Sequence, residues 1–272
     1  MLKQTIVRCL ALAKIVILDG LRCHTVLGLS LIALAAVCSN LFFYQFIPRN
    51  IDQFTIDFIL SIGWMSSLLF LLFHAVGTVS WGSNKKTIFA IMARPLSRAN
   101  YVVGHFIGLA LLLFLLNCII ALLGIWNIDI IRQQAGTYFP NFYIGWYAAN
   151  WLGMLTMELM ILAVIIFFSS IIRGSFPVML LALCYYFACN GLPVIRETLA
   201  NIKNPPPLAI AVTKWLTLVF PDFSGLDLRE TILNGRNEIS PDFIVANSLY
   251  FIVYIIFFLY VASFIYKQRD LV

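Results

Sequence analysis

Six long apolar runs dominate this 272-residue sequence and restrict what it can fold into. Each run has the roughly 20 residues that a helix needs to cross the hydrocarbon core of a bilayer. We place the spans at 25–47, 58–80, 105–126, 146–171, 175–195 and 242–266. Because backbone polar groups find no water partners in lipid, such runs must be helical. The sequence therefore predicts an all-α membrane protein, organised as a single transmembrane domain over residues 1–272.

The composition indicates the same class of protein. The chain is 62% hydrophobic and 11% charged, with a mean hydropathy of +0.94, which leaves no room for a large soluble domain. Its net charge of +6 could suggest a nucleic-acid partner. The cations, however, lie at the ends of apolar runs, where charges orient a membrane protein. We therefore expect contact with membrane lipid and no nucleic-acid partner.

The distribution of cations predicts the orientation of the chain. Under a scheme with both termini on one side, that side holds Asp19 and Asp270 as its only acids. The same side holds these cations: Lys3, Arg8, Lys14, Arg22, Lys85, Lys86, Arg94, Arg98, Arg173, Lys267 and Arg269. Since short cytoplasmic loops carry an excess of Lys and Arg, we expect both termini in the cytoplasm.

Residues 1–22 have the pattern of an amphipathic helix. Leu2, Ile6, Leu10, Ala13 and Ile17 recur at helical spacing on one side, with the cations on the other arc. Such a helix is typical of the membrane interface, where its cations face anionic headgroups. The alternative is a cytoplasmic helix that packs on another part of a protein.

A polar segment without acids, residues 82–104, separates the second and third spans. Thr87 to Ala93 can form a short helix, which Pro95 stops because the residue before a proline avoids the helical region. Ser97 can then cap a new helix that begins near Arg98. The sequence thus predicts a short cytoplasmic helix held between two membrane helices.

The same segment carries a family resemblance. The run Ala93-Arg94-Pro95-Leu96-Ser97-Arg98, followed by Tyr101 and Gly104, resembles the loop between the second and third spans of ABC-2 type transporter permeases. The six-span layout and Phe220-Pro221-Asp222-Phe223 before the last span are also similar. The resemblance implies a permease in the plasma (inner) membrane of a prokaryote, paired with a second copy or a related permease. It also implies docking on two separate ABC ATPase subunits, with 1–22 as the elbow helix and 82–104 as the coupling loop.

Within the coupling loop we assign ATPase contact to cations and apolar anchors, because central apolar and Arg contacts contribute most to interfaces. The candidates are Lys85, Lys86, Ile88, Phe89, Met92, Arg94 and Arg98. The alternative is that the cations only fix the topology of the chain.

The chain lacks sequence motifs for chemistry of its own. It has no Gly-x-x-x-x-Gly-Lys-Ser/Thr run to cradle nucleotide phosphates, and no Gly-x-Ser-x-Gly or His-Glu-x-x-His. Its His and Cys residues do not have the spacing of a metal site. We expect a non-enzymatic chain without catalytic residues, metal or cofactor, with ATP and Mg bound by the partner ATPase.

Glu158 is the one acid well inside a predicted span. A charge at that depth is costly and usually faces a cavity or a partner group. Glu158, His74 and Asn117 are therefore candidates for the translocation path. The alternative is a hydrogen-bonded carboxyl that holds helices together, with His74 or Asn117 as its partner.

Residues 196–241 form the longest predicted outer loop. Leu208 to Phe220 is apolar but too short to cross a bilayer, so we expect a re-entrant or interfacial helix there. It could plug the outer surface of the bundle or form part of a substrate exit. Before this loop, Asn190, Gly191 and Pro193 predict local unwinding at the outer end of the fifth span.

Together these features predict the transmembrane subunit of an ABC exporter. Aromatic residues make up 15% of the chain and few polar groups lie inside the spans, which favours an amphipathic or lipid-like substrate. One alternative is a non-transporting ABC-type component that transmits ATP-driven force to a periplasmic or extracellular partner. Another is an intramembrane enzyme, for which Glu158 with His74 is the only candidate pair.

Overall fold

The computed structural model describes residues 2–47, 50–84, 98–134, 142–202, 206–229, 232 and 241–268. All regular structure in these ranges is helical, which confirms the predicted all-α class. Six helices are long and apolar enough to cross a membrane: Thr25–Phe46, Ile51–Ser80, Ala99–Gln134, Ile144–Ile171, Ser175–Asn201 and Phe243–Gln268. The six predicted spans correspond to these helices one for one.

The described elements follow in this order along the chain. The helices are α1 (Leu2–Arg22), α2 (Thr25–Phe43), α3 (Ile51–Leu69), α4 (Val76–Asn84), α6 (Arg98–Gln134), α7 (Ile144–Ile171), α8 (Ser175–Asn201), α9 (Pro207–Val219) and α11 (Pro241–Gln268). Single turns are η1 (Tyr44–Phe46), the π-helical η2 (Phe70–Ala75) and η4 (Phe223–Leu226). Because η2 joins α3 to α4 without a break, the second span is one helix with a π-helical turn.

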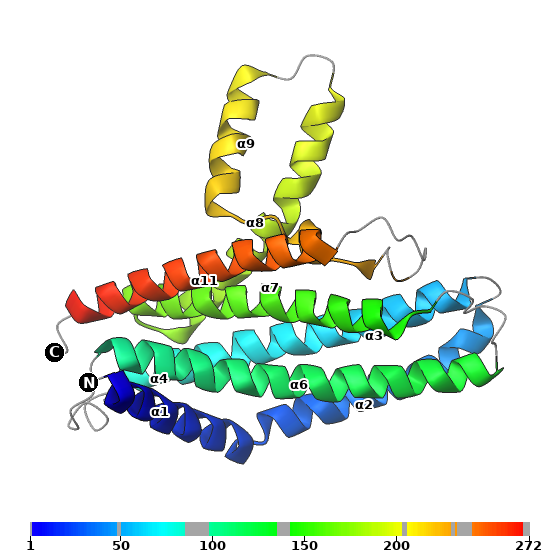
Figure 1. Cartoon of the computed structure of the whole chain (residues 1–272), viewed down its shortest axis with the longest axis horizontal. Coiled ribbons are helices and arrows are strands. Elements are labelled where there is room, and N and C mark those ends of the chain that lie inside the picture. Colours follow the sequence, from blue (N-terminus) through cyan, green and yellow to red (C-terminus); the bar gives the residue numbers. More distant parts are fainter. Residues whose placement is uncertain are drawn as a thin grey trace.

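The long helices lie side by side along the long axis of the molecule (Figure 1). The start of α1 and the end of α11 lie at the same end of this bundle, which we call the proximal end (Figure 1). The rings of Tyr101, near the start of α6, and Tyr266, near the end of α11, are 5.9 Å apart at this end. The opposite end is called distal.

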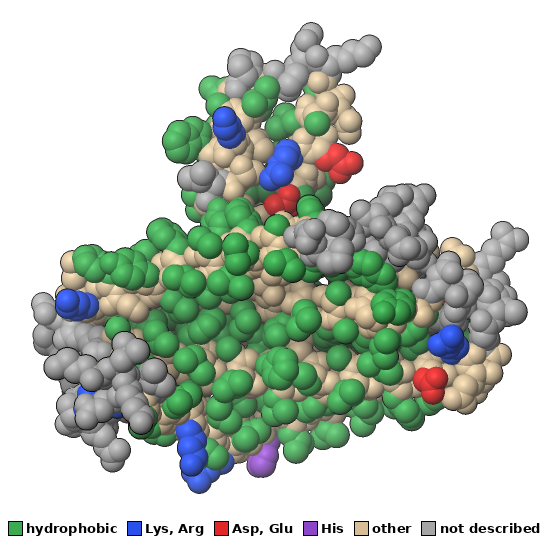
Figure 2. Space-filling view, viewed as in Figure 1, with side chains coloured by type: hydrophobic (Ala, Val, Ile, Leu, Met, Phe, Trp, Pro, Cys, Tyr) green, Lys and Arg blue, Asp and Glu red, His purple; other side chains and the backbone are tan. Residues whose placement is uncertain are grey.

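The surface of the bundle is apolar where lipid would contact it. Figure 2 shows hydrophobic side chains covering the middle of the visible face, with Lys and Arg at its two ends, on its lower left edge and on the projection above it. Large side chains such as Leu31, Phe73 and Leu122 are more than half exposed. A soluble domain rarely exposes an apolar area of this extent, so the surface supports the assignment to a membrane.

Two spans are longer than predicted. The second begins at Ile51 instead of residue 58, and the third covers Arg98–Gln134 instead of 105–126. At the distal end, Asn127 on α6 donates a hydrogen bond to the carbonyl of Val37 at 2.8 Å and accepts one from Asn40 at 2.8 Å. These bonds to α2 stabilise α6 beyond its apolar core, which hydropathy alone does not reveal.

α1 and α2 lie in succession along α6. From the proximal end onward, Cys9 Sγ lies 3.8 Å from the carbonyl oxygen of Asn100, Val16 packs on Gly108, and Val37 accepts its bond from Asn127. The residues in contact stay about 91 positions apart in the sequence, so α1 and α2 run parallel to α6. His24, with a φ of 53°, interrupts the helix between α1 and α2.

The described part of α1 therefore packs lengthwise on another helix of the same chain. Cys9, Leu12, Ala13 and Val16 are buried, and this burial raises the pKa of the Cys9 thiol. Leu10, which we predicted on the apolar face with Ala13, is 54% exposed. The predicted amphipathic pattern is present. In the structure its buried face packs on α6, as in the alternative that we considered, and an interfacial elbow helix is not confirmed.

The fifth span differs from its prediction. α8 continues through Asn190, Gly191 and Pro193 to Asn201, so the predicted unwinding was wrong. A proline removes only one backbone hydrogen bond, and a membrane helix can continue past it. The end of α8 and the antiparallel α9 leave the bundle together and form a projection that we call the α8–α9 hairpin (Figure 1).

The short apolar helix predicted within the outer loop is confirmed as α9. Leu208 is 75% exposed and Trp215 is 74% exposed, so within the described chain α9 leaves its large side chains uncovered. α9 projects away from the side of the bundle (Figure 1), and its role as a plug or as part of an exit stays a prediction.

The contact between α1 and α6 gives a test of the fold. A Cβ at Gly108 would lie 2.7 Å from Val16 Cβ and 3.0 Å from the carbonyl oxygen of Ala13. We expect Gly108→Ala to separate α1 from α6 and to lower the free energy of unfolding by about 1–3 kcal/mol. Thermal unfolding of the purified protein in detergent measures this loss.

Gly77→Ala is the matched control, because nothing lies within 4 Å of the new Cβ. Since alanine favours a helix over glycine by about 1 kcal/mol, this variant should be neutral or more stable. Equal unfolding temperatures for the two variants would contradict the packing of α1 on α6.

Candidate functional site

The predicted coupling residues are largely outside the described part of the chain. Lys85, Lys86, Ile88, Phe89, Met92 and Arg94 lie between the end of α4 and the start of α6. Arg98 begins α6, and its side chain is also outside the described set. The structure places the two flanking helix ends at the proximal end of the bundle (Figure 1). The role of these residues in ATPase contact stays a prediction.

Glu158 lies at the centre of a buried polar contact between three spans. Its side chain on α7 is fully buried, and Oε2 accepts a hydrogen bond from Asn117 Nδ2 on α6 at 2.6 Å. The same Asn117 nitrogen lies 3.1 Å from Ser67 Oγ on α3 and 3.1 Å from the carbonyl oxygen of Leu113. The predicted partnership of Glu158 with Asn117 is thus confirmed.

This contact is not fully satisfied. Glu158 Oε1 and Asn117 Oδ1 are buried without a hydrogen-bond partner among the described residues. Burying a polar atom without a hydrogen-bond partner costs free energy. A polar residue kept inside a membrane at this cost usually has a functional or structural role. The arrangement favours a carboxyl that holds α3, α6 and α7 together. A direct role of Glu158 in the translocation path stays a prediction.

His74 belongs to a different group of contacts. Its Nδ1 lies 3.2 Å from Thr25 Oγ1 on α2, and its ring centroid lies 5.1 Å from that of Phe70. The described hydrogen bonds therefore join His74 to the first span and Glu158 to the third. The geometry does not supply the Glu158–His74 pair that an intramembrane enzyme would need.

A large cleft opens between α3, α7 and α8 in the distal half of the bundle. Its volume is about 1200 Å³, and we call it the distal cleft. Its lining residues on these helices are Gln53, Asp57, Ser61, Trp64 and Met65 of α3, Met154 and Met157 of α7, and Tyr186, Asn190, Pro193, Val194, Arg196, Glu197 and Ala200 of α8. Asp222, Phe223, Ser224, Asp227 and Arg229, from the segment after α9, complete it.

The deep part of the distal cleft is aromatic and rich in sulfur. Trp64 Nε1 donates a hydrogen bond to the hydroxyl of Tyr186 at 2.8 Å, and the two ring centroids are 5.8 Å apart. This bond links α3 to α8. Met154 and Met157 of α7 are buried and line the same part of the cleft. Methionine side chains adapt their shape easily, so this surface can accept varied apolar groups.

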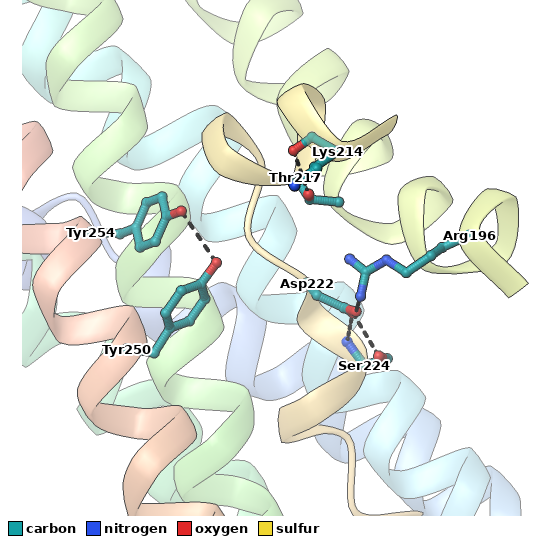
Figure 3. Close-up of polar contacts among 7 residues, drawn as sticks. All are labelled: Arg196, Lys214, Thr217, Asp222, Ser224, Tyr250 and Tyr254. Carbon is teal, nitrogen blue, oxygen red and sulfur yellow. Dashed lines mark hydrogen bonds and ion pairs between the residues drawn. The ribbon is translucent and has the colours of Figure 1, made fainter. Parts of the chain in front are cut away.

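Charged side chains line the mouth of the distal cleft. Arg196 of α8 pairs with Asp222 at 3.3 Å, and Figure 3 shows Asp222 also accepting hydrogen bonds from Ser224. Arg229 lies 3.4 Å from Asp227 and 3.5 Å from Ser61 Oγ, which ties the segment after α9 to α3. Each arginine in the cleft therefore has a carboxylate partner.

The segment after α9 is held in place by buried hydrogen bonds. Asn150 Oδ1 on α7 accepts from the backbone N–H of Leu228 at 2.9 Å. Asn247 Nδ2 on α11 donates to the carbonyl of Gly225 at 2.9 Å. These contacts position Asp222, Asp227 and Arg229 over the cleft, and Phe223–Leu226 form a short helical turn within the described part of the segment.

Our sequence analysis missed the distal cleft. Its residues come from four separate parts of the chain, and only the fold brings them together. One signal was available on α3, where Asp57, Ser61 and Trp64 recur at helical spacing. The corresponding face of α8 carries Tyr186, Asn190 and Glu197. Polar residues that share one face of a span predict a cavity or a polar partner.

The comparisons with known proteins do not identify this chain. No family model matches it, and a search of curated proteins finds no match. Its function must therefore be argued from the site.

The buried contact of Glu158 gives a second test. Asn117→Ala removes the donor that lies 2.6 Å from Glu158 Oε2, and it leaves that buried oxygen without its partner. We expect a loss of about 1–3 kcal/mol in the free energy of unfolding. Glu158→Gln keeps an acceptor oxygen for Asn117 and should cost less.

Asn190→Ala provides the control, because Asn190 is exposed and its Nδ2 bonds only to a backbone carbonyl of its own helix. Thermal unfolding in detergent compares the three variants. If Asn117→Ala unfolds at the same temperature as Asn190→Ala, the contact does not hold the spans together.

Proposed function

We propose that this chain is the permease subunit of an ATP-driven ABC exporter for an amphipathic substrate. The observation that carries the proposal is the distal cleft, which combines a buried aromatic and methionine surface with a charged mouth in a bundle of six apolar helices. An amphipathic molecule has the same division, with an apolar part and a polar part. A cleft of this size can accept it between two spans.

The energy source would be a separate ATPase. The sequence has no P-loop, and ATP and Mg would be bound by the partner subunit. The proposed coupling loop connects the end of α4 to the start of α6, and both lie at the proximal end beside the start of α1 (Figure 1). A push on the loop would therefore act on the second and third spans. The second span, α3 with α4, also forms one wall of the distal cleft.

The proposed assembly has two ABC ATPase subunits and a second permease, either an identical copy or a related chain. We place it in the plasma (inner) membrane of a prokaryote with both termini in the cytoplasm. The start of α1 and the end of α11 lie at the same end of the bundle, and the excess of cations in the segments on that side supports its cytoplasmic position.

Co-purification tests the proposal. The chain would be expressed with an ABC ATPase encoded beside its gene, extracted in mild detergent and isolated through a tag on the permease. We expect the ATPase to co-purify with the chain. Reversing charge at Lys85, Lys86 and Arg94 to Glu should reduce the recovered ATPase at least tenfold, because each reversal places a like charge opposite acidic groups of the ATPase.

Arg132→Glu is the control, since Arg132 lies in the last turn of α6 at the distal end. It should leave the association unchanged. Absence of any ATPase beside a folded permease contradicts the proposed function. Retention of the ATPase by the triple reversal contradicts the assignment of the coupling loop.

A force-transmitting component without transport is the second candidate. The α8–α9 hairpin favours it, because within the described chain this projection leaves Leu208 and Trp215 uncovered. A periplasmic or extracellular partner could bind there. Substrate transport by the reconstituted complex distinguishes the two candidates, since a purely force-transmitting component transports nothing.

A further inference from the structure

We propose that the distal cleft binds lipophilic cations, that is, bulky apolar or aromatic molecules that carry a permanent positive charge. The inference deepens the proposed function by naming its substrate class, and its biological meaning rests on that function. The binding itself depends only on the residues that line the cleft.

The distal cleft has an excess of carboxyl groups. Four carboxyl groups line it, from Asp57, Glu197, Asp222 and Asp227, against the two guanidinium groups of Arg196 and Arg229. The two arginines pair with Asp222 and Asp227 at 3.3 and 3.4 Å. Asp57 and Glu197 have no ion-pair partner within 4.0 Å among the described residues. The cleft thus has two more carboxyl groups than guanidinium groups, even though the charge of Arg229 acts on Asp57 as well as on Asp227.

The carboxyl groups of Asp57 and Glu197 lie on two facing helices of the cleft. Asp57 lies on α3, seven residues or about two helical turns before Trp64. Glu197 lies on the facing helix α8, eleven residues after Tyr186. Both acids therefore lie nearer the mouth than the Trp64–Tyr186 contact, one on each wall. A positive centre held between them would direct its apolar substituents toward the deep part of the cleft.

The deep surface of the cleft favours an organic cation. Indole and phenol rings attract cations through their faces, and methionine sulfur is polarizable. Trp64, Tyr186, Met154 and Met157 supply this surface. A small hydrated ion would gain nothing from it, and an anion would be repelled by the free carboxylates. The combination selects for a cation with bulky organic substituents.

The volume agrees with a bulky ligand. At about 1200 Å³, the cleft exceeds the roughly 300–1,000 Å³ of ordinary small-molecule pockets. A compact metal ion would leave nearly all of that space unfilled, and no group of three or more His, Cys, Asp or Glu among the described residues could hold one.

Binding of tetraphenylphosphonium tests the inference. The full chain would be placed in nanodiscs of zwitterionic phosphatidylcholine, and radiolabelled ion would be measured by equilibrium dialysis against empty nanodiscs. We expect saturable binding that neutral triphenylphosphine oxide does not displace. Asp57→Asn and Glu197→Gln should each weaken the affinity about tenfold, as expected when one attractive charge is lost.

Two further variants separate a local effect from misfolding. Asp129→Asn removes an exposed acid of α6 that does not line the cleft, so it should bind like the unmodified chain. Arg196→Gln removes a positive charge from the cleft and should tighten binding, a direction that misfolding does not produce. All variants would first be checked for an unchanged elution profile.

The inference is overturned if the ion does not bind saturably or if the neutral analogue displaces it. Equal affinity in Asp57→Asn, Glu197→Gln and Asp129→Asn overturns it as well. Failure of the proposed function is a distinct result. Cation binding without ATPase co-purification contradicts only the permease assignment, and ATPase co-purification without cation binding contradicts only the substrate class.

Discussion

The rest of the bundle depends on the close packing of other helices against α6. In lipid the hydrophobic effect does not drive helices together, so association relies on tight packing and on a few polar contacts. α6 supplies both kinds of contact along its length. Gly104 and Gly108 admit Leu12 and Val16 of α1 near the proximal end. Further along, Asn117 bonds to α3 and α7, and Asn127 bonds to α2. Four helices, α1, α2, α3 and α7, are thereby fixed to α6.

The two helices beside the distal cleft differ in how firmly they are held. α7 buries side chains along its whole length, from Tyr147 to Ser170. α8 buries only Val178, Ala182, Tyr185, Cys189 and Leu192, and its last turns leave the bundle. Because few buried contacts make an element easier to displace, we expect α8 to move more readily than α7. The hydrogen bond from Trp64 to Tyr186 joins α8 to α3 beside the cleft.

The sequence predicted what depends on local composition and missed what depends on the arrangement of distant segments. Six spans and the short helix α9 follow from the length of apolar runs. The pairing of Glu158 with Asn117 could be anticipated, because polar groups at similar depth in lipid must find each other. The position of α1 could not. Its periodicity shows that one face is apolar, but it does not show whether lipid or another helix covers that face.

The distal cleft could not be predicted from the sequence for the same reason. Asp57 and Glu197 are separated by about half of the chain, and the segment that carries Asp222 belongs to neither of their helices. Hydrogen bonds from Asn150 and Asn247, together with the buried side chains of Phe223 and Leu226, place that segment over the cleft. Both asparagines belong to helices that hydropathy analysis finds easily, yet nothing in their local sequence indicates their partners.

The buried contact of Glu158 and the distal cleft share the same two helices, which links their geometry. On α3, Ser67 follows Trp64 by three residues, and on α7, Glu158 follows Met157 directly. Asn117 of α6 lies against both Ser67 and Glu158, so it fixes the separation of α3 and α7 just beyond the deep end of the cleft. Any motion that changes the width of the cleft between α3 and α7 must therefore stretch or rearrange this contact. The contact of Glu158 therefore constrains the width of the cleft, although Glu158 does not line it.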